Sequence, residues 1–452
     1  MPDDAPWRGR RLHFIGIGGA GMSGLALVAQ ALGAEVTGSD RAESSYLTRL
    51  RDAGISPAIG HAAEHVPDGA EVIYSTAVAP DNPERAAARE RGLTERHRGE
   101  LLGEISALKR CIAVSGTHGK TTTAAMIAHV LRACGLDPAY LVGGELRDTG
   151  SNAGWGGGEW IVVEADESDR SLLELRPEVA VLTNVELDHH ATYGSRLDLE
   201  ATLRAFLALA PRAVVWDRPE LLALRDGPVV AFDVPDAQLD AGGARFEWRG
   251  LEVRLGVPGH HNALNAAAAL TASELAGADP KAAAAALAGF HGASRRFQRL
   301  GCTASGAEVY DDYAHHPTEV RATLQAARTL EPRRLVAVFQ PHLYSRTAAL
   351  WRDFGDALAL ADLAVVLEIY EARERAADFP GVSGRLVAQA AADAGGGRRV
   401  AWLPAFDDAE RFLRRELRAG DVCLMLGAGD IDALGRRLVE GAPPVATRGG
   451  QA

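Results

Sequence analysis

The sequence predicts an α/β fold of about three domains, and three observations support this. The chain has 452 residues, which at roughly 150 residues per domain suits three separate cores. Apolar segments of strand length alternate with helix-like segments along most of the chain, as in parallel sheets covered by helices. Several apolar segments run directly into glycine-rich or acidic turns. Because open parallel sheets hold ligands at the carboxyl ends of their strands, we expect binding sites at these turns.

Composition argues against several classes of protein. The net charge is −12 and no basic run is present, which argues against a nucleic-acid partner. The first apolar segment, Leu12 to Ile17, is short and leads into glycines, so it predicts neither a signal peptide nor a membrane span. Four cysteines lack metal-site spacing, which is typical of a reducing compartment. We therefore expect a cytoplasmic protein that binds no nucleic acid and no membrane.

The stretch from Cys111 to Thr123 predicts a strand, a glycine-rich turn and a helix from Thr121 to Cys134. Such a turn directs backbone N–H groups at a phosphate. Lys120 would reach the outer phosphates and Thr121 would offer its hydroxyl to Mg²⁺. The match to the consensus loop is partial, because Val114 stands where the first glycine is usual. Only three of the 48 basic residues are lysines, and all others are arginines. A lysine in this turn therefore indicates that the site needs a compact positive charge. The alternative is that Lys120 is only a solvated side chain of a loop.

A second glycine-rich turn lies near the N-terminus. A strand is expected at Leu12–Ile15, followed by glycines at 16, 18 and 21 and by a helix to about Ala31. A further strand near residues 34–37 ends close to Asp40, and the whole fits a dinucleotide fingerprint with a ribose-binding carboxylate. The alternative is that the glycines only let the helix and the strand pack closely. We expect the first domain to end near residue 106.

Two central strands end in acidic residues. Strands are expected over residues 160–166 and 179–185, and the acids and histidines that close them are Glu164, Asp166, Glu167, Asp169, Glu186, Asp188, His189 and His190. Carboxylates at the ends of parallel strands beside a phosphate loop predict a Mg²⁺ site. The alternative is that these acidic residues only form solvated loops. Asn262 and Asn265 begin the next expected helix, where they either hold a purine edge or cap the helix.

After residues 294–297 the alternation starts again, which indicates a linker and a third α/β region. A short strand is expected from residue 308, closed by the polar residues up to Pro317, and further strands are expected at 334–339, 364–369 and 422–426. The polar residues that follow these strands are His315, His316, His342, Arg346 and Asp430. They predict a third ligand-binding edge.

These motifs resemble the Mur ligase family. The resemblance is carried by Thr117–Thr121, Glu164–Asp169, His261–Asn265, Asp311–Pro317 and Phe339–His342, together with the loop from Gly16 to Gly24 and the stretches 370–374 and 380–384. It implies three domains: a Rossmann-like domain for a UDP-sugar (1–106), a central ATP-binding P-loop domain with a mostly parallel sheet (107–296), and a C-terminal Rossmann-like domain closing over ATP and the amino acid (297–452).

The resemblance implies an ATP- and Mg²⁺-dependent amide ligase. L-alanine would be joined to the carboxylate of UDP-N-acetylmuramate through an acyl phosphate, in peptidoglycan precursor synthesis. The expected assembly is a monomer or homodimer. Three alternatives remain: a ligase that recycles murein tripeptide, a nicotinamide-dependent oxidoreductase using the first glycine loop, and a nucleotide-binding switch without chemistry of its own.

The same resemblance implies roles for individual residues. ATP would be held by Gly116, Thr117, His118, Gly119, Lys120, Thr121 and Thr122, with His261, Asn262 and Asn265 near adenine and Asp312 near the ribose. Thr121 and Glu164 would bind the first Mg²⁺, and His189 would help with a second. His315 and Arg346 would contact the transferring phosphate or the alanine carboxylate. The UDP moiety would meet Gly18, Gly19, Gly21, Met22 and Asp40, with His61, Ser75 and Asn82 nearby. Two departures from the family pattern are Leu343, where arginine is common, and His190-Ala191.

Overall fold

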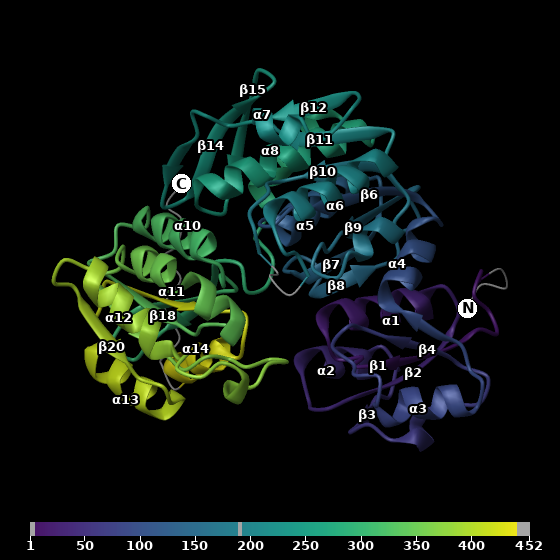
Figure 1. Cartoon of the computed structure of the whole chain (residues 1–452). Helices are drawn as coiled ribbons and strands as arrows, with labels where there is room; N and C mark the ends of the chain where they lie inside the picture. Colours follow the sequence, from purple (N-terminus) through teal and green to yellow (C-terminus); the bar gives the residue numbers. More distant parts are fainter. Residues whose placement is uncertain (1–4, 189–191, 441–452) are drawn as a thin grey trace. The chain divides into compact units, whose positions relative to one another are not determined.

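The computed structural model describes residues 5–188 and 192–440, which form four β-sheets and the helices around them (Figure 1). Contacts divide the chain into two compact units. The first contains the residues up to Pro235 together with 247–253 and 264–291, and the second contains the remainder. Within the described ranges no helix is long and apolar enough to span a membrane.

The first sheet of the first unit is parallel and has the strand order β3-β2-β1-β4-β5. The strand order reverses between β1 and β4, and ligands of such sheets bind at the carboxyl ends of strands at this point. The elements are β1 Arg11–Ile15, α1 Ala20–Ala31, β2 Glu35–Asp40, α2 Ser45–Asp52, β3 Ala58–Ile59, β4 Glu71–Tyr74, α3 Pro83–Glu90, β5 Glu95–His97 and α4 Arg98–Ser106.

The second sheet of this unit has the order β12-β11-β10-β6-β9-β7-β8 and is parallel except for β8. Its middle strand β6 pairs with β10 and β9, so the turn after β6 lies between two neighbouring strand ends. The elements are β6 Arg110–Ser115, α5 Lys120–Ala133, β7 Ala139–Leu146, β8 Ser151–Gly154, β9 Trp160–Glu164, β10 Pro177–Leu182, α6 Arg196–Leu209, β11 Arg212–Trp216, α7 Pro219–Leu222 and β12 Val229–Phe232. Helices α8 His260–Leu275 and α9 Pro280–Ala286 come later in the chain.

The large sheet of the second unit has the order β16-β17-β21-β18-β19-β20, in which only β16 is antiparallel. Its elements are β16 Gln298–Cys302, β17 Glu308–Asp312, α10 Pro317–Arg328, β18 Arg334–Phe339, α11 Tyr344–Leu358, β19 Leu363–Val366, α12 Gly384–Ala394, β20 Arg399–Trp402, α13 Phe406–Glu416, β21 Asp421–Leu426 and α14 Ile431–Val439. A small three-stranded sheet is formed by β13 Gln238–Asp240, β14 Gly243–Trp248 and β15 Leu251–Leu255.

The predicted α/β fold with three mostly parallel sheets is confirmed, and the differences lie at element ends. β2 runs to Asp40, so that residue belongs to the strand. α5 begins at Lys120, one residue earlier than expected, because Gly119 takes a left-handed conformation and ends the turn. β10 stops at Leu182, three residues before the expected end, because Thr183 and Asn184 turn toward the loop after β6.

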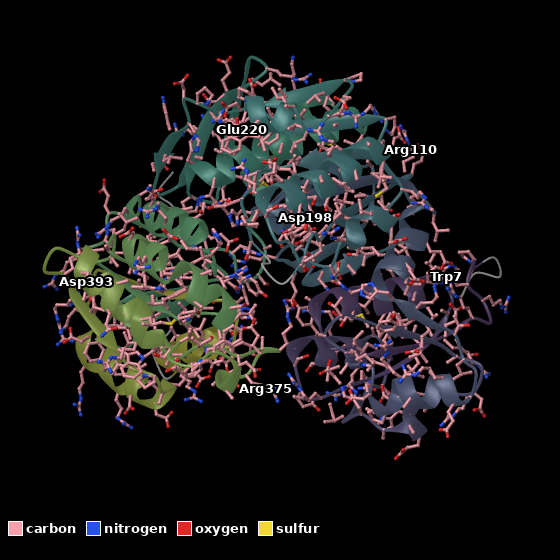
Figure 2. All side chains as sticks on the ribbon, in the orientation of Figure 1. Trp7, Arg110, Asp198, Glu220, Arg375 and Asp393 are labelled. Atoms are coloured by element: carbon pink, nitrogen blue, oxygen red, sulfur yellow. The ribbon has the colours of Figure 1, made fainter. Side chains whose placement is uncertain are left out.

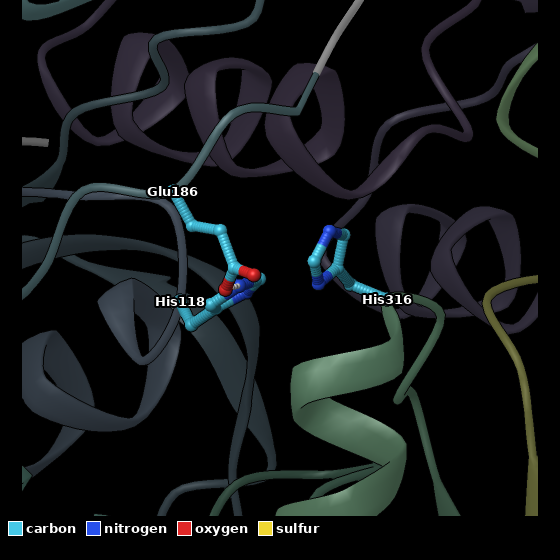
Figure 3. Close-up of side chains that lie close together, drawn as sticks. All are labelled: His118, Glu186 and His316. Carbon is cyan, nitrogen blue, oxygen red and sulfur yellow. Dashed lines mark hydrogen bonds and ion pairs between the residues drawn. The ribbon is translucent and has the colours of Figure 1, made fainter. Parts of the chain in front are cut away.

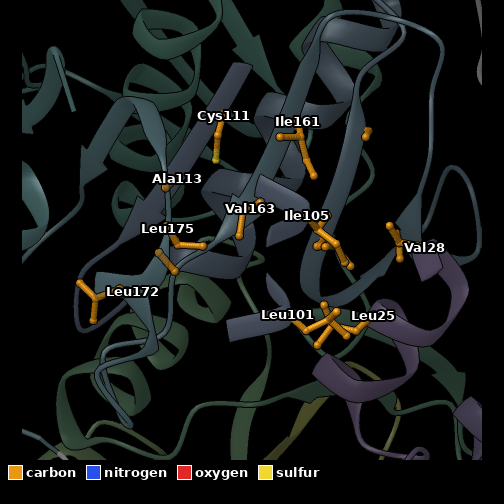
Figure 4. Packing of buried hydrophobic residues seen from close by; sticks show 14 of the residues in the cluster. Leu25, Val28, Leu101, Ile105, Cys111, Ala113, Ile161, Val163, Leu172 and Leu175 are labelled. Carbon is orange, nitrogen blue, oxygen red and sulfur yellow. The ribbon is translucent and has the colours of Figure 1, made fainter. Parts of the chain in front are cut away.

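One apolar cluster joins the first two sheets. Leu25 and Val28 of α1, Leu101 and Ile105 of α4 and Val163 of β9 belong to it, and all are almost fully buried (Figure 4). α1 lies close to the second sheet at Gly24, where a Cβ would lie 3.2 Å from Leu141 Cδ2 and from Asn152 Nδ2. The first two sheets are therefore packed as one body.

Short polar side chains start several helices. Ser44, Asn82, Ser195 and Asp279 each accept a backbone N–H hydrogen bond at a helix N-terminus, which satisfies a donor that the helix itself leaves unpaired.

Surface positions carry most of the charge. Glu220, Arg375 and Asp393 are exposed, whereas Trp7 is buried beneath the guanidinium of Arg10, 4.3 Å from its ring centroid (Figure 2).

Arg98 at the start of α4 makes a polar connection across this body. Its guanidinium donates to Asp169 Oδ2 at 2.7 Å and to Asp166 Oδ2 at 2.9 Å, both in the loop after β9. Burial opposes the charge on Arg98, but these carboxylates raise its pKa further above the usual value. The Asp169 side chain is only 3 % exposed, so the ion pair with Arg98 is largely shielded from water.

We expect Arg98→Met to destabilise the protein by about 3 kcal/mol, because removing one member of a buried ion pair leaves the other charge uncompensated. Urea unfolding followed by circular dichroism measures the change. Arg51→Met is the matched control: Arg51 pairs with Glu43 at the surface, and such exposed pairs contribute little. Equal stability of both variants would contradict the expectation.

Candidate active site

The turn between β6 and α5, residues 116–119, accepts only glycine at two positions. Gly116 has φ 129° and Gly119 has φ 83°, values that side chains with a Cβ rarely adopt. A Cβ on Gly116 would lie 2.2 Å from Thr183 Oγ1, and a Cβ on Gly119 would lie 2.4 Å from Asn265 Oδ1. The turn leads directly into α5, so the first N–H groups of that helix are directed toward the place where a phosphate would bind.

Lys120, the first residue of α5, folds back over this turn. Its ammonium donates to the carbonyls of Gly116 (2.7 Å) and Thr117 (3.1 Å) and pairs with both carboxylate oxygens of Glu167, at 3.0 and 2.9 Å. Burial opposes the charge, but Glu167, Asp166 and Glu164 together raise the pKa of Lys120. The lysine is therefore a firmly cationic group at the head of the helix.

Thr121 and Glu164 meet beside Lys120, as the sequence predicted for a magnesium site. Thr121 Oγ1 donates to Glu164 Oε1 at 2.9 Å, and Gly143 N donates to Glu164 Oε2 at 2.6 Å. A hydroxyl and a carboxylate are the hard oxygen ligands that Mg²⁺ prefers, so the residues present fit this ion. His189, which was expected to help with a second Mg²⁺, lies outside the described residues.

The rest of the turn is tied to the chain that follows β10. Thr117 Oγ1 donates to the carbonyl of Glu186 at 2.8 Å and accepts from its N–H at 2.9 Å. His118 N donates to Asn184 Oδ1 (2.9 Å), and its ring nitrogen Nε2 lies 3.0 Å from Glu186 Oε2 (Figure 3). These contacts hold the turn rigidly against a neighbouring strand end.

The residues expected near adenine do not all belong to the same unit. Asn265 of α8 is buried with its Oδ1 next to Gly119, so it borders the phosphate turn. Thr122 is buried in the first turn of α5. Asn262 belongs to the second unit, where its Nδ2 donates to the Pro258 carbonyl at 2.7 Å. Burial lowers the pKa of His261 to about 4, so its imidazole is neutral near pH 7.

His315 and Arg346 come together in the second unit, at the carboxyl edge of its sheet. The His315 and His342 rings are 6.0 Å apart between centroids, and Arg346 Nη1 lies 3.3 Å from His342 Nδ1. The His342 ring stacks on Tyr370 at 5.7 Å. Leu343 is the N-cap residue just before α11, has φ 72° and is buried, so its side chain packs in the interior.

Asp312 ends β17, but its carboxylate already has internal partners. It accepts hydrogen bonds from Phe297 N (2.7 Å), Ala314 N (2.8 Å) and Thr323 Oγ1 (3.3 Å). Burial raises the pKa of Asp312 despite the two backbone donors. Here the carboxylate shapes the chain around the strand end, and the ribose contact stays a prediction.

The N-terminal glycine loop closes on Asp40. Gly18 N donates to Asp40 Oδ2 at 2.8 Å, while the N–H groups of Gly16 and Ile17 donate to the Ser39 carbonyl at 2.8 and 3.0 Å. Gly19 caps α1. A Cβ on Gly21 would lie 3.1 Å from Arg98 Nη1. The start of the glycine loop therefore lies against Asp40 at the carboxyl ends of β1 and β2.

The other residues expected near UDP differ in burial and in hydrogen-bond partners. The side chain of Met22 is buried in the core, so only its backbone could face a ligand. Asn82 caps α3, accepting from Glu84 N at 2.9 Å. Ser75 follows β4 and is partly exposed. His61 Nδ1 lies 2.9 Å from Ser39 Oγ.

A cavity of about 210 Å³ in the first unit is lined by residues of α1, α4, β7 and the carboxyl end of β9. Gly21 and Gly24 of α1 line it on one side, and Gly143, Glu164 and Asp166 line it on the other. A ligand in this cavity could touch the glycine-loop helix and the expected magnesium ligand at the same time.

Sequence reasoning assigned no role to Asn184 and Glu84, and it placed Glu167 only in an acidic cluster expected near Mg²⁺. Glu167 was visible as part of an acidic run, but its pairing with Lys120 depends on the geometry of the loop. Asn184 is one of many polar residues after a strand. Glu84 lies in an expected helix, and its partners are far away in sequence.

Models of three Mur ligase domains match the chain in succession. They are the Mur ligase family catalytic domain at residues 11–110, the Mur ligase middle domain at 114–273 and the Mur ligase glutamate ligase domain at 295–429. The UDP-N-acetylmuramate–L-alanine ligase of Rubrobacter xylanophilus is 46% identical over 95% of this chain and 99% of its own length. That of Acidithiobacillus ferrooxidans is 43% identical, covering 94% and 96%. The chain therefore belongs to the Mur ligase family, which confirms the resemblance seen in its motifs.

Solved structures agree with this assignment. The UDP-N-acetylmuramate–alanine ligase of Thermotoga maritima has a TM-score of 0.83 and 31% identity, covering 95% of this chain and 98% of its own. A murein peptide ligase from Psychrobacter arcticus has a TM-score of 0.72 and 25% identity, covering 97% and 100%.

We expect Lys120→Arg to lower turnover by roughly 100-fold or more. The planar guanidinium of arginine cannot take the place of the compact ammonium, which lies between two carbonyls and Glu167. Steady-state kinetics of ATP-dependent product formation measure the loss. Lys109→Arg is the matched control, since the Lys109 ammonium also donates to backbone carbonyls, those of Gly156 and Gly158, but away from the turn. Near-normal activity of the Lys120 variant would refute this role.

Proposed function

We propose that this protein uses ATP to join the amine of L-alanine to the muramoyl carboxylate of UDP-N-acetylmuramate, in peptidoglycan precursor synthesis. One observation carries the proposal. Lys120 and the Thr121–Glu164 pair stand together at the carboxyl edge of the central sheet, beside a cavity that also borders the glycine-loop helix. The ligases named above, similar along nearly the whole chain, support the choice of substrates.

The phosphate turn would hold ATP, and Lys120 would bind its transferring phosphoryl group. In the structure the Lys120 ammonium is paired with the Glu167 carboxylate. On ATP binding, phosphate oxygens would replace this carboxylate as its partners. Thr121 and Glu164 would hold one Mg²⁺, and His189 would help to hold a second. When bound, the ion would neutralise phosphate charge as the two anionic reactants meet.

The acceptor carboxylate would attack the γ-phosphorus, forming a carboxyl–phosphate bond while the bond to ADP breaks. The amine of L-alanine, as the free base, would then attack the acyl carbon and release phosphate. His315 and Arg346, clustered with His342 in the second unit, would bind the phosphate or the alanine carboxylate.

Further parts of the proposal follow from the sequence. They are the domain limits 1–106, 107–296 and 297–452, the binding of adenosine by Asn262, Asn265 and Asp312, a cytoplasmic location, and a monomeric or homodimeric assembly. The second candidate function, recycling of a murein peptide, is favoured by the likeness to the Psychrobacter arcticus ligase, whose identity and TM-score are lower than those of the Thermotoga maritima ligase.

The direct test is a product assay by mass spectrometry in which L-alanine and murein tripeptide compete for UDP-N-acetylmuramate. We expect the alanyl product, with phosphate release that requires ATP, Mg²⁺, UDP-N-acetylmuramate and L-alanine together. A tripeptide product would favour the second candidate. Full-rate phosphate release without any amine would indicate a plain ATPase.

We expect Thr121→Val to raise the Mg²⁺ concentration for half-maximal activity by about tenfold, because an oxygen ligand is lost while the side-chain shape is kept. A Mg²⁺ titration at saturating substrates measures it. Thr123→Val is the matched control two residues along α5. The Thr123 hydroxyl is buried and has no hydrogen-bond partner among the described residues, so its loss should leave the titration unchanged. Identical titrations for the two variants would exclude Thr121 as a ligand.

A further inference from the structure

Glu84 is a fully buried carboxylate in the first turn of α3. Asn82 caps the same turn. A buried carboxylate is stable only if hydrogen-bond donors surround it. Glu84 Oε1 accepts from Ala62 N at 3.2 Å, and Glu84 Oε2 accepts from Ser39 Oγ at 2.6 Å. The Glu84 side chain therefore connects α3 to β2 and to the segment after β3.

Three histidines surround the same carboxylate. His13 Nε2 of β1 lies 3.4 Å from Glu84 Oε2, His65 Nδ1 lies 3.2 Å from Oε1, and His61 Nδ1 lies 3.7 Å from Oε2. Burial alone would raise the pKa of Glu84, but the hydrogen bonds from His13 and Ser39 hold it below its usual value. Glu84 is therefore ionised at neutral pH and can only accept hydrogen bonds.

Because Glu84 can only accept, the donor and the acceptor of the Glu84–Ser39 and Ser39–His61 hydrogen bonds are determined. The Ser39 hydroxyl has one proton, which it donates to Glu84. The contact of 2.9 Å between Ser39 Oγ and His61 Nδ1 must therefore use a proton on His61. A neutral imidazole that carries its proton on Nδ1 has an acceptor at Nε2.

This relay ends at the glycine-loop site. The Ser39 carbonyl accepts the N–H groups of Gly16 and Ile17, and the next residue, Asp40, accepts from Gly18. His61 follows β3 at the same carboxyl edge, where Gly60 N donates to the Asp40 carbonyl at 2.8 Å. The His61 side chain is 23% exposed, while the ring edge at Nδ1 faces buried groups.

We infer that Glu84 is a positioning residue that acts through Ser39 to keep His61 in the Nδ1–H tautomer, so that His61 Nε2 accepts a hydrogen bond from the nucleoside of the acceptor substrate. A ribose hydroxyl or the imide N–H of uracil would be the donor. The inference rests on the proposed function for the identity of the ligand. The relay itself consists only of residues of this chain.

Glu84→Gln tests the relay because it keeps the shape and reverses the polarity. The amide can donate to Ser39 Oγ, whose proton then turns to His61 Nδ1 and moves the imidazole proton to Nε2. We expect the KM for UDP-N-acetylmuramate and the Kd for UDP to rise about tenfold, equivalent to one lost hydrogen bond. The kcat and the KM for ATP should stay within twofold. Glu90→Gln, at the exposed end of the same helix, is the matched control and should change neither.

Nitrogen-15 NMR of the histidine rings provides a readout that loss of structure would not mimic. The His61 signal is identified as the one that is lost in His61→Gln. In the wild type this signal should correspond to the Nδ1–H tautomer, and in Glu84→Gln it should correspond to the Nε2–H tautomer. If Glu84→Gln does not fold, Ser39→Ala takes its place and should raise the Kd for UDP and remove the bias toward Nδ1–H. An Nε2–H tautomer in the wild type, or an unchanged KM in the variant, would overturn the inference.

The outcomes separate the relay from the proposed function. UDP binding and the tautomer are measured without turnover, so a relay that behaves as described in a protein that makes no alanyl product would overturn only the proposed function. Normal alanyl product formation with an unchanged KM in Glu84→Gln would overturn only the relay.

Discussion

The bend from β6 into α5 is the constraint on which the rest of the candidate site depends. Gly116 and Gly119 bring the backbone so close to Thr183 and Asn265 that no side chain fits, and this places Lys120 at the head of the helix. The ammonium is there sheltered from water, where its attraction to Glu167 is far stronger than at the surface. The acids after β9 can approach this point because β9 is the direct neighbour of β6 in the sheet.

Buried glutamates organise both halves of the first unit. Glu167 holds a cation over the phosphate turn, and Glu84 orders a serine and three histidines behind the first glycine loop. In each case a costly buried charge is offset by several donors from different elements. Each carboxylate therefore fixes the orientation of groups that would otherwise turn freely, which is the kind of support that precise ligand binding requires.

Much of this could be predicted from the sequence, and the reasons are physical. The meeting of Thr121 with Glu164 follows from two adjacent parallel strands that end at the same edge, and apolar runs followed by polar turns indicate such strands. The surroundings of Glu84 could not be predicted, because its partners come from residues 13, 39, 61, 62 and 65. The resemblance placed Met22 near the substrate but could not indicate that its side chain packs in the core.

The apolar cluster shared by the first two sheets has a consequence for dissecting the protein. Leu25 and Val28 on α1 and Leu101 and Ile105 on α4 pack in the same cluster as Val163 of the second sheet. A fragment that stopped near residue 106 would present these leucines, valine and isoleucine to water, and exposed patches of this kind promote aggregation. The first 106 residues are therefore a poor candidate for separate expression, and ligand screening on a truncated protein should use a piece that includes the second sheet.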